Sequence, residues 1–201
     1  MGARGERATF LLGVVGGIGQ SWHTRLLVET VLSASADEQV DTALLDLSET
    51  PIDFAANRPA EEYSAATRRA LELAGHAEGF VFGSPIYRAT YTGAFKNFFD
   101  LMPVEALLGK AAALVATGAS FHHFLALDIA FRPIMTFFNM HTVPGVLYGS
   151  REQFLPERAI NDALREQAEA LGRDLVYMTR QLAGRGWGPP SPGVGAVTRP
   201  R

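Results

Sequence analysis

The chain of 201 residues is long enough for one domain with a buried core, and its 47% hydrophobic and 19% charged residues are ordinary for a globular protein. A net charge of -3 argues against general binding to nucleic acid or anionic membranes, and no apolar run is long enough for a signal peptide or a membrane span, so we expect a cytoplasmic protein. The absence of cysteine excludes disulfides and thiol redox chemistry, so electron transfer would need a cofactor.

Strand-like and helix-like patterns alternate along the chain. Apolar, β-branched stretches predict strands at 9–15, 40–45, 79–83, 110–116 and 141–148. Apolar residues spaced three or four apart predict helices at 22–34, 61–76, 94–102, 121–140 and from Pro156 to about residue 183. This order predicts an α/β fold in which a five-stranded parallel sheet carries helices on both faces.

The pattern indicates a single domain over residues 1–183 with no internal repeat. Beyond Ala183 the sequence GRGWGPPSPGVGAVTRPR is dense in glycine and proline and cannot bury a core. We therefore expect residues 184–201 to form a flexible tail.

Three loops follow the carboxyl ends of predicted strands, where open α/β sheets bind their ligands: 16–24, 84–93 and 117–123. The first has small residues and hydroxyls just before a helix, which suits either a phosphate site or a plain tight turn. It is not a dinucleotide fingerprint of the Rossmann type, because Trp22 stands where the third glycine belongs. Asp46, the nearest candidate for a ribose-binding acid, also lies further on than the usual spacing.

The second loop and its helix, GSPIYRATYTGAFKNFFD, resemble the NADPH-dependent FMN reductase family, which carries G-S-P-x-Y-x-x-x-x-S/T-G-x-L/F-K-N-x-x-D here. The resemblance continues through the third loop, where Ala119 replaces the family's second glycine, and on to Arg132 and Pro133. It covers roughly residues 9–150 and is closest to the sulfonate-utilisation FMN reductases.

This resemblance implies a flavodoxin-like fold and a reductase that passes hydride from NADH or NADPH to FMN. It places the flavin phosphate in the first loop and the isoalloxazine ring between the second and third. No catalytic side chain is expected, because flavin and nicotinamide carry the chemistry, and the sequence suggests no metal site. The residues expected to bind FMN are Gly16, Gly17, Gln20, Ser21, His23, Thr24, Pro85, Ile86, Tyr87, Arg88, Thr117, Gly118, Ala119 and Ser120.

The first loop departs from the family's G-S-x-R-x-x-S-x-T pattern. Gly17 replaces a serine, Gly19 replaces the arginine and Trp22 replaces another serine, while Thr24 is kept. FMN is then either a weakly held, exchangeable substrate, or the site has adapted to a different ligand. The alternatives to a reductase are a tight-binding flavoprotein that reduces quinones, azo dyes or other organic acceptors, and a non-catalytic flavin- or partner-binding protein.

The predicted helix at 121–140 has apolar residues on every side, more than contact with one sheet requires. We therefore expect a homodimer or homotetramer held through Phe121 to Met140, with Pro133 bending this helix rather than ending it. Lys96 and Asp100, four residues apart, are expected to form a surface ion pair. A flavin-dependent monooxygenase would fit as the recipient of reduced FMN.

Overall fold

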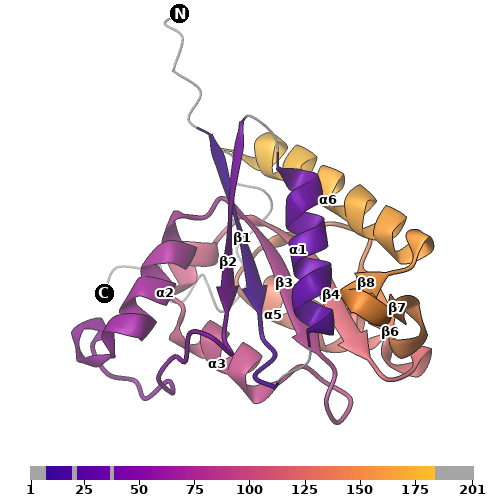
Figure 1. The fold of residues 1–201 in the computed structure, drawn as a ribbon. Coiled ribbons are helices and arrows are strands. Elements are labelled where there is room, and N and C mark those ends of the chain that lie inside the picture. The colour runs from indigo at the N-terminus through magenta and orange to yellow at the C-terminus, as the bar shows by residue number, and fades with distance from the viewer. Residues whose placement is uncertain (1–7, 20–21, 37–38, 184–201) are drawn as a thin grey trace, which may run out of the picture.

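The computed structural model describes residues 8–19, 22–36 and 39–183, so the expected tail at 184–201 lies outside the described residues. Figure 1 shows a twisted parallel sheet between two layers of helices. Its strands are β1 Thr9–Val15, β2 Val40–Asp46, β3 Gly79–Pro85, β4 Ala111–Gly118, β5 His141–Thr142 and β6 Leu147–Ser150. They run in the order β2-β1-β3-β4, and both β5 and β6 pair with the outer edge of β4. This flavodoxin-like order confirms the predicted fold class.

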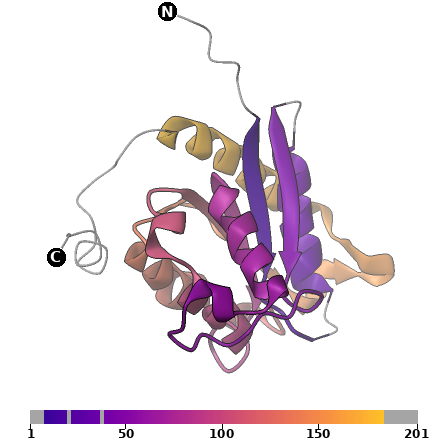
Figure 2. The same cartoon turned by 90° about the vertical axis from the view of Figure 1, so that its left-hand side faces the viewer.

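Helices cover both faces of the sheet, as the two views in Figure 1 and Figure 2 show. One face carries α1 His23–Ser35 and α6 Asp162–Leu182, and the other carries α2 Ala65–His76, α3 Gly93–Leu101, α4 Val104–Leu107 and α5 Arg132–Phe137. Side chains of β1 alternate between these layers, since Leu11 and Val15 pack towards α1 while Leu12 and Val14 pack in the opposite core.

The predicted strand at 141–148 is broken into β5 and β6. Pro144 lies in the gap between them, where it has no N–H to offer the ladder. Two predicted helix starts were also too early. The helix expected from Glu61 begins at Ala65, after Ser64 caps it by accepting the Thr67 N–H, and the helix expected from Pro156 begins at Asp162, capped by Asn161.

Residues 151–160, which precede α6, form an excursion in place of the expected first turns of that helix. It consists of the turn η4 Arg151–Gln153, the strand β7 Phe154–Leu155, the turn η5 Pro156–Arg158 and the strand β8 Ala159–Ile160. β7 and β8 pair antiparallel as a small hairpin.

No helix in the described part of the chain combines the length and apolar character needed to cross a membrane.

The predicted helix at 121–140 is not one regular α-helix. It consists of a 3-10 turn, η2 Phe121–His123, then the π-helical turn η3 Leu127–Phe131, and then α5. The Arg132 N–H bonds to the Leu127 carbonyl across the wider π turn, just before Pro133, whose ring crowds the preceding turn and lacks an N–H. The helix nevertheless continues directly from η3 into α5, so Pro133 does not end it, as predicted.

Candidate functional site

Short hydrogen bonds join the three loops at the carboxyl edge of the sheet. The Gly16 N–H donates to the Gly83 carbonyl at 2.7 Å, and the Thr92 hydroxyl donates to the Gly16 carbonyl. The Ile86 N–H donates to the Thr117 carbonyl at 2.7 Å, linking the second loop to the third. These bonds tie the three loops to one another at the edge of the sheet.

A cavity of about 260 Å³ lies where the loops meet. Seven of the residues predicted to bind FMN line it: His23, Pro85, Ile86, Tyr87, Thr117, Gly118 and Ala119. Arg151 and Phe154 complete the lining. Residues of all three predicted loops therefore line one cavity, together with two residues of the segment before α6 that the sequence did not indicate.

Predicted residues outside the lining, where the structure describes them, lie near this cavity. A side chain at Gly17 would lie 3.4 Å from Pro85, and one at Gly19 would lie 3.8 Å from the Tyr87 hydroxyl, so the first loop faces the second. The buried Thr24 hydroxyl lies 2.6 Å from that of Thr117. Gln20 and Ser21 are outside the described residues.

The tip of the second loop is a tight two-residue turn. Tyr87 and Thr90 exchange backbone hydrogen bonds of 2.8 and 3.3 Å, and the residues between them, Arg88 and Ala89, have φ angles of +53° and +73°. Side chains other than glycine seldom adopt this conformation. The turn leaves Tyr87 exposed at the cavity and places Arg88 at the tip rather than in the lining.

The third loop is supported from beneath by Tyr148 at the end of the sheet. The Tyr148 hydroxyl donates to the Ser120 carbonyl at 2.7 Å, and burial raises its pKa. A Cβ at Gly118 would lie 2.1 Å from the same hydroxyl oxygen, so only glycine fits there. Tyr148 and Gly118 together set the path of the loop past the cavity.

The start of α1 is packed between aromatic rings. The His23 ring lies 4.3 Å from Trp22 and 4.2 Å from Phe154, measured between ring centroids. Burial, and then the positive charge of Arg151, lower the pKa of His23 below 6.5. The Trp22 side chain accepts no hydrogen bond from the first turn of the helix.

Sequence reasoning missed Arg151 and Phe154 because it treated the region before α6 as helix. One signal was present: Arg151 immediately follows the carboxyl end of the last strand of the sheet, the edge at which α/β proteins bind ligands.

The residues that line the cavity fit both parts of FMN, the flavin ring and the phosphate. The cavity offers apolar and aromatic surfaces at Ile86 and Tyr87 for a planar ring. The N-terminal end of α1, with the positive end of its dipole, and the guanidinium of Arg151 suit an anion. FMN combines the two features in one molecule.

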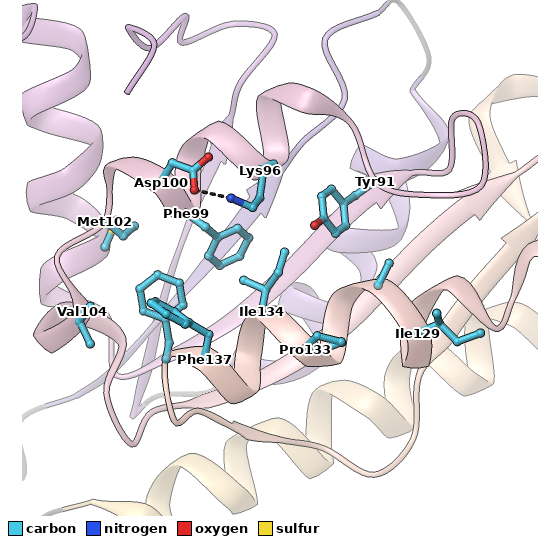
Figure 3. A pocket seen from close by; sticks show the side chains of 12 residues that line it. Tyr91, Lys96, Phe99, Asp100, Met102, Val104, Ile129, Pro133, Ile134 and Phe137 are labelled. Carbon is cyan, nitrogen blue, oxygen red and sulfur yellow. Dashed lines mark hydrogen bonds and ion pairs between the residues drawn. The ribbon is translucent and has the colours of Figure 1, made fainter. Parts of the chain in front are cut away.

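A second, larger hollow of about 730 Å³ lies between α3 and the helix formed by η3 and α5 (Figure 3). Its walls are mainly apolar, with Phe99 on one side and Ile129, Pro133 and Phe137 on the other. Lys96 and Asp100 form the expected ion pair at its rim. Ile129 and Phe137 are 71% and 50% exposed, so the apolar surface extends beyond the hollow.

Comparison with known proteins identifies the family. The model of the NADPH-dependent FMN reductases matches residues 10–153. An NAD(P)H-dependent FAD/FMN reductase of Geobacillus thermodenitrificans is 33% identical over 88% of this chain and 96% of its own length. The NADH-dependent FMN reductase SfnF of Pseudomonas putida is 41% identical over 53% of this chain and 57% of its own.

Among solved structures, the apo form of the NADH:FMN oxidoreductase EmoB superposes with a TM-score of 0.73. It is 27% identical, and the match covers 89% of this chain and 92% of that one. The family model, which matches residues 10–153, spans the strands of the sheet and the three loops. The chain belongs to the NADPH-dependent FMN reductase family.

Proposed function

We propose that the protein is an NAD(P)H-dependent FMN reductase, in which a reduced nicotinamide passes hydride to FMN. The observation that carries this proposal is the cavity in which His23, the second loop and the third loop meet in a chain of this family. Bound FMN supplies the hydride acceptor, and the chain supplies its binding surface and its electrostatic environment.

The residues of the cavity divide this work between them. Pro85, Ile86 and Tyr87 offer one wall for the flavin ring, and Thr117, Gly118 and Ala119 offer backbone donors for its pyrimidine edge. Donors fixed in advance stabilise the negative charge that the flavin gains on reduction. The hydrogen bonds between the loops hold these groups in place, so little reorganisation accompanies the reaction.

Absorbance spectra of the purified protein, taken before and after FMN is added with NADH or NADPH, test this function. A colourless protein that oxidises the nicotinamide rapidly only when FMN is added supports an exchangeable flavin, which the altered first loop favours. A yellow protein supports tightly bound flavin and acceptors such as quinones. No oxidation above the rate without protein would refute the reductase.

The same proposal extends to a homo-oligomer. The segment from Phe121 to Met140 forms one wall of the hollow beside α3. It also carries exposed apolar side chains at the border of the hollow, including Ile129 and Phe137. A second copy, related by a twofold axis, would place the protruding apolar side chains of each chain against the hollow of the other. Such a dimer, or a tetramer built from it, would bury the exposed apolar side chains of this segment, which monomers seldom leave exposed as a patch.

Reduced FMN released from the cavity would be a substrate for a flavin-dependent monooxygenase, which we propose as the functional partner. The open position of Tyr87, 48% exposed at the cavity, supports exchange of the flavin with solvent. A coupled assay with such a monooxygenase should show product formation only when this protein, FMN and a nicotinamide are all present. A cytoplasmic location stays a prediction.

A further inference from the structure

The first loop brings no positive charge of its own to the cavity. Residues 16–24 include neither lysine nor arginine, whereas a phosphate monoester carries about -1.5 to -2 charges at neutral pH. The first cation after the loop is Arg25. Its Nε donates to Glu29 at 2.8 Å and its Nη1 donates to Asp46 at 3.3 Å, and these bonds hold it beside the end of β2. A phosphate at this site therefore needs charge from another element.

Among the described residues that line the cavity, Arg151 is the one whose side chain carries a permanent charge. Its backbone is held on both sides. The Gln153 side chain accepts the Ser150 N–H at 3.0 Å while Ser150 caps the Gln153 backbone, and the Gln153 carbonyl accepts the Asn161 N–H at 2.9 Å. The short turn therefore presents the guanidinium from a rigid base.

The charge of Arg151 acts on the start of α1. It contributes, after burial, to lowering the pKa of His23, which lines the same cavity. Within the described part of the chain Arg151 forms no ion pair, whereas Arg25, Lys96 and Arg132 each have a carboxylate partner. An anion between Arg151 and the first turn of α1 would meet both a guanidinium and the positive end of the helix dipole.

We propose that Arg151 binds a phosphate monoester in this cavity, in place of the arginine that the family carries in its first loop. This inference rests on the proposed function for the identity of the ligands. The reaction offers two phosphate monoesters, the 5′-phosphate of FMN and the 2′-phosphate of NADPH. The planar guanidinium can donate two parallel hydrogen bonds to either.

Steady-state kinetics of the full chain and its Arg151→Ala variant separate these ligands. FMN and riboflavin, which lacks the phosphate, are each paired with NADH and with NADPH. We expect the substitution to lower kcat/KM for FMN by about 10- to 100-fold and to change that for riboflavin within about twofold. A loss confined to NADPH, with either flavin, supports the same chemistry and assigns it to the dinucleotide. An equal loss for all four pairs, or no loss, overturns the proposal.

Binding measurements test Arg151 without turnover. Quenching of flavin fluorescence should show that the wild-type protein prefers FMN to riboflavin and that Arg151→Ala loses most of this preference. A protein that binds in this way yet oxidises no nicotinamide would refute the reductase but not the role of Arg151. The role of Arg151 is overturned if Arg151→Ala keeps the preference for FMN over riboflavin. It is also overturned if the wild-type protein itself shows no preference for FMN over riboflavin and none for NADPH over NADH.

Two further variants serve as controls. Arg158→Ala removes an equal charge from the same excursion but outside the cavity lining, so it should keep the preference for FMN. Arg151→Lys keeps the charge but loses the planar pair of donors, and should give an intermediate preference. Circular dichroism spectra that match the wild type establish that the variants are folded.

Discussion

Gly118 lies against the Tyr148 hydroxyl, and this contact leaves no room for a side chain on the third loop. A Cβ there would lie 2.1 Å from the hydroxyl oxygen and 3.2 Å from Cζ. We expect Gly118→Ala to lower the free energy of unfolding by about 1–3 kcal/mol, because overpacking forces the ring or the loop to move. Urea denaturation measures this loss, and the apparent KM for FMN should rise with it.

The Tyr148→Phe variant provides the matched comparison. Alone it removes the bond to the Ser120 carbonyl and should cost about 1 kcal/mol. In the double variant with Gly118→Ala, Tyr148→Phe also removes the closest clashing atom. The double variant should therefore lose less free energy of unfolding than the two single variants lose together. Additive losses would show that the hydroxyl is not what excludes a side chain at position 118.

Arg88 at the tip of the second loop should matter more to flavin than Lys96 on α3. Arg88 directly follows Tyr87, which lines the cavity, whereas Lys96 is paired with Asp100 at the rim of the other hollow. We expect Arg88→Ala to raise the apparent KM for FMN by about tenfold, the effect of one charged hydrogen bond, and Lys96→Ala to change it little. Steady-state kinetics at saturating nicotinamide decide the order, and the reverse order would move the site to α3.

At the scale of elements, the loop between β2 and α2 is tied down by hydrogen bonds at both of its ends. The Asp53 carboxylate accepts from the Thr67 hydroxyl and the Ser64 N–H, each at 2.7 Å, and the buried Asn97 side chain bonds the backbone of Asp53 and Ala55 at 2.9 Å. Hydrogen bonds from Thr67 and then Ser64 lower the pKa of Asp53 from 3.8 to about 2.

This pKa predicts how the contribution of Asp53 depends on pH. Because the folded-state pKa is the lower one, the ionised carboxylate stabilises the fold above pH 3.8, and the stabilisation disappears as the pH falls towards 2. Asp53→Asn should therefore be less stable than the wild type at pH 6, with the difference shrinking between pH 4 and pH 2. Urea denaturation across this range measures it, with Asp174→Asn on the exposed side of α6 as control. If the difference in free energy of unfolding between the wild type and Asp53→Asn does not vary with pH, the lowered pKa of Asp53 is contradicted.

The sequence predicted the elements that repeat a simple pattern and failed where a single residue interrupts one. Apolar strands and amphipathic helices placed β1 to β4, α1 and α3 within a few residues. The apolar pattern could not show that Pro144 divides the last strand or that a π turn precedes Pro133, because both effects arise from missing backbone N–H groups. The hairpin before α6 has too few residues to produce a strand pattern.

The cavity was predictable to the extent that it is made of loops at strand ends. His23, Pro85, Ile86, Tyr87, Thr117, Gly118 and Ala119 were all expected there. Arg151 and Phe154 reach it through the hairpin, and Tyr148 supports the third loop from across the sheet. Such contacts depend on how elements distant in sequence pack, which spacing along the chain does not report.

At the scale of the whole molecule, five of the eleven large apolar side chains that are exposed among the described residues lie on one segment. Phe121, Phe124, Leu125, Ile129 and Phe137 are all exposed between residues 121 and 137. We expect light scattering to show a dimer or tetramer, and Phe137→Glu to shift it towards the monomer because a charge cannot be buried unpaired in an apolar interface.

The exposed Tyr177 on α6 provides the control for that experiment. It is 70% exposed and lies on the other face of the sheet, so Tyr177→Glu should leave the oligomer intact. A wild-type protein that is monomeric at all concentrations would contradict the interface. Equal dissociation by both variants would also count against this segment.

The central claim is that the cavity at the sheet edge binds FMN and brings it to a reduced nicotinamide. The most direct test follows the oxidation of NADH and of NADPH by the purified full-length protein, with FMN, FAD or riboflavin added in turn and a protein-free reaction as reference. We expect oxidation well above the reference with FMN and at least one nicotinamide, as binding of both at this cavity requires. Failure of all three flavins to accelerate oxidation of either nicotinamide above the reference would contradict it.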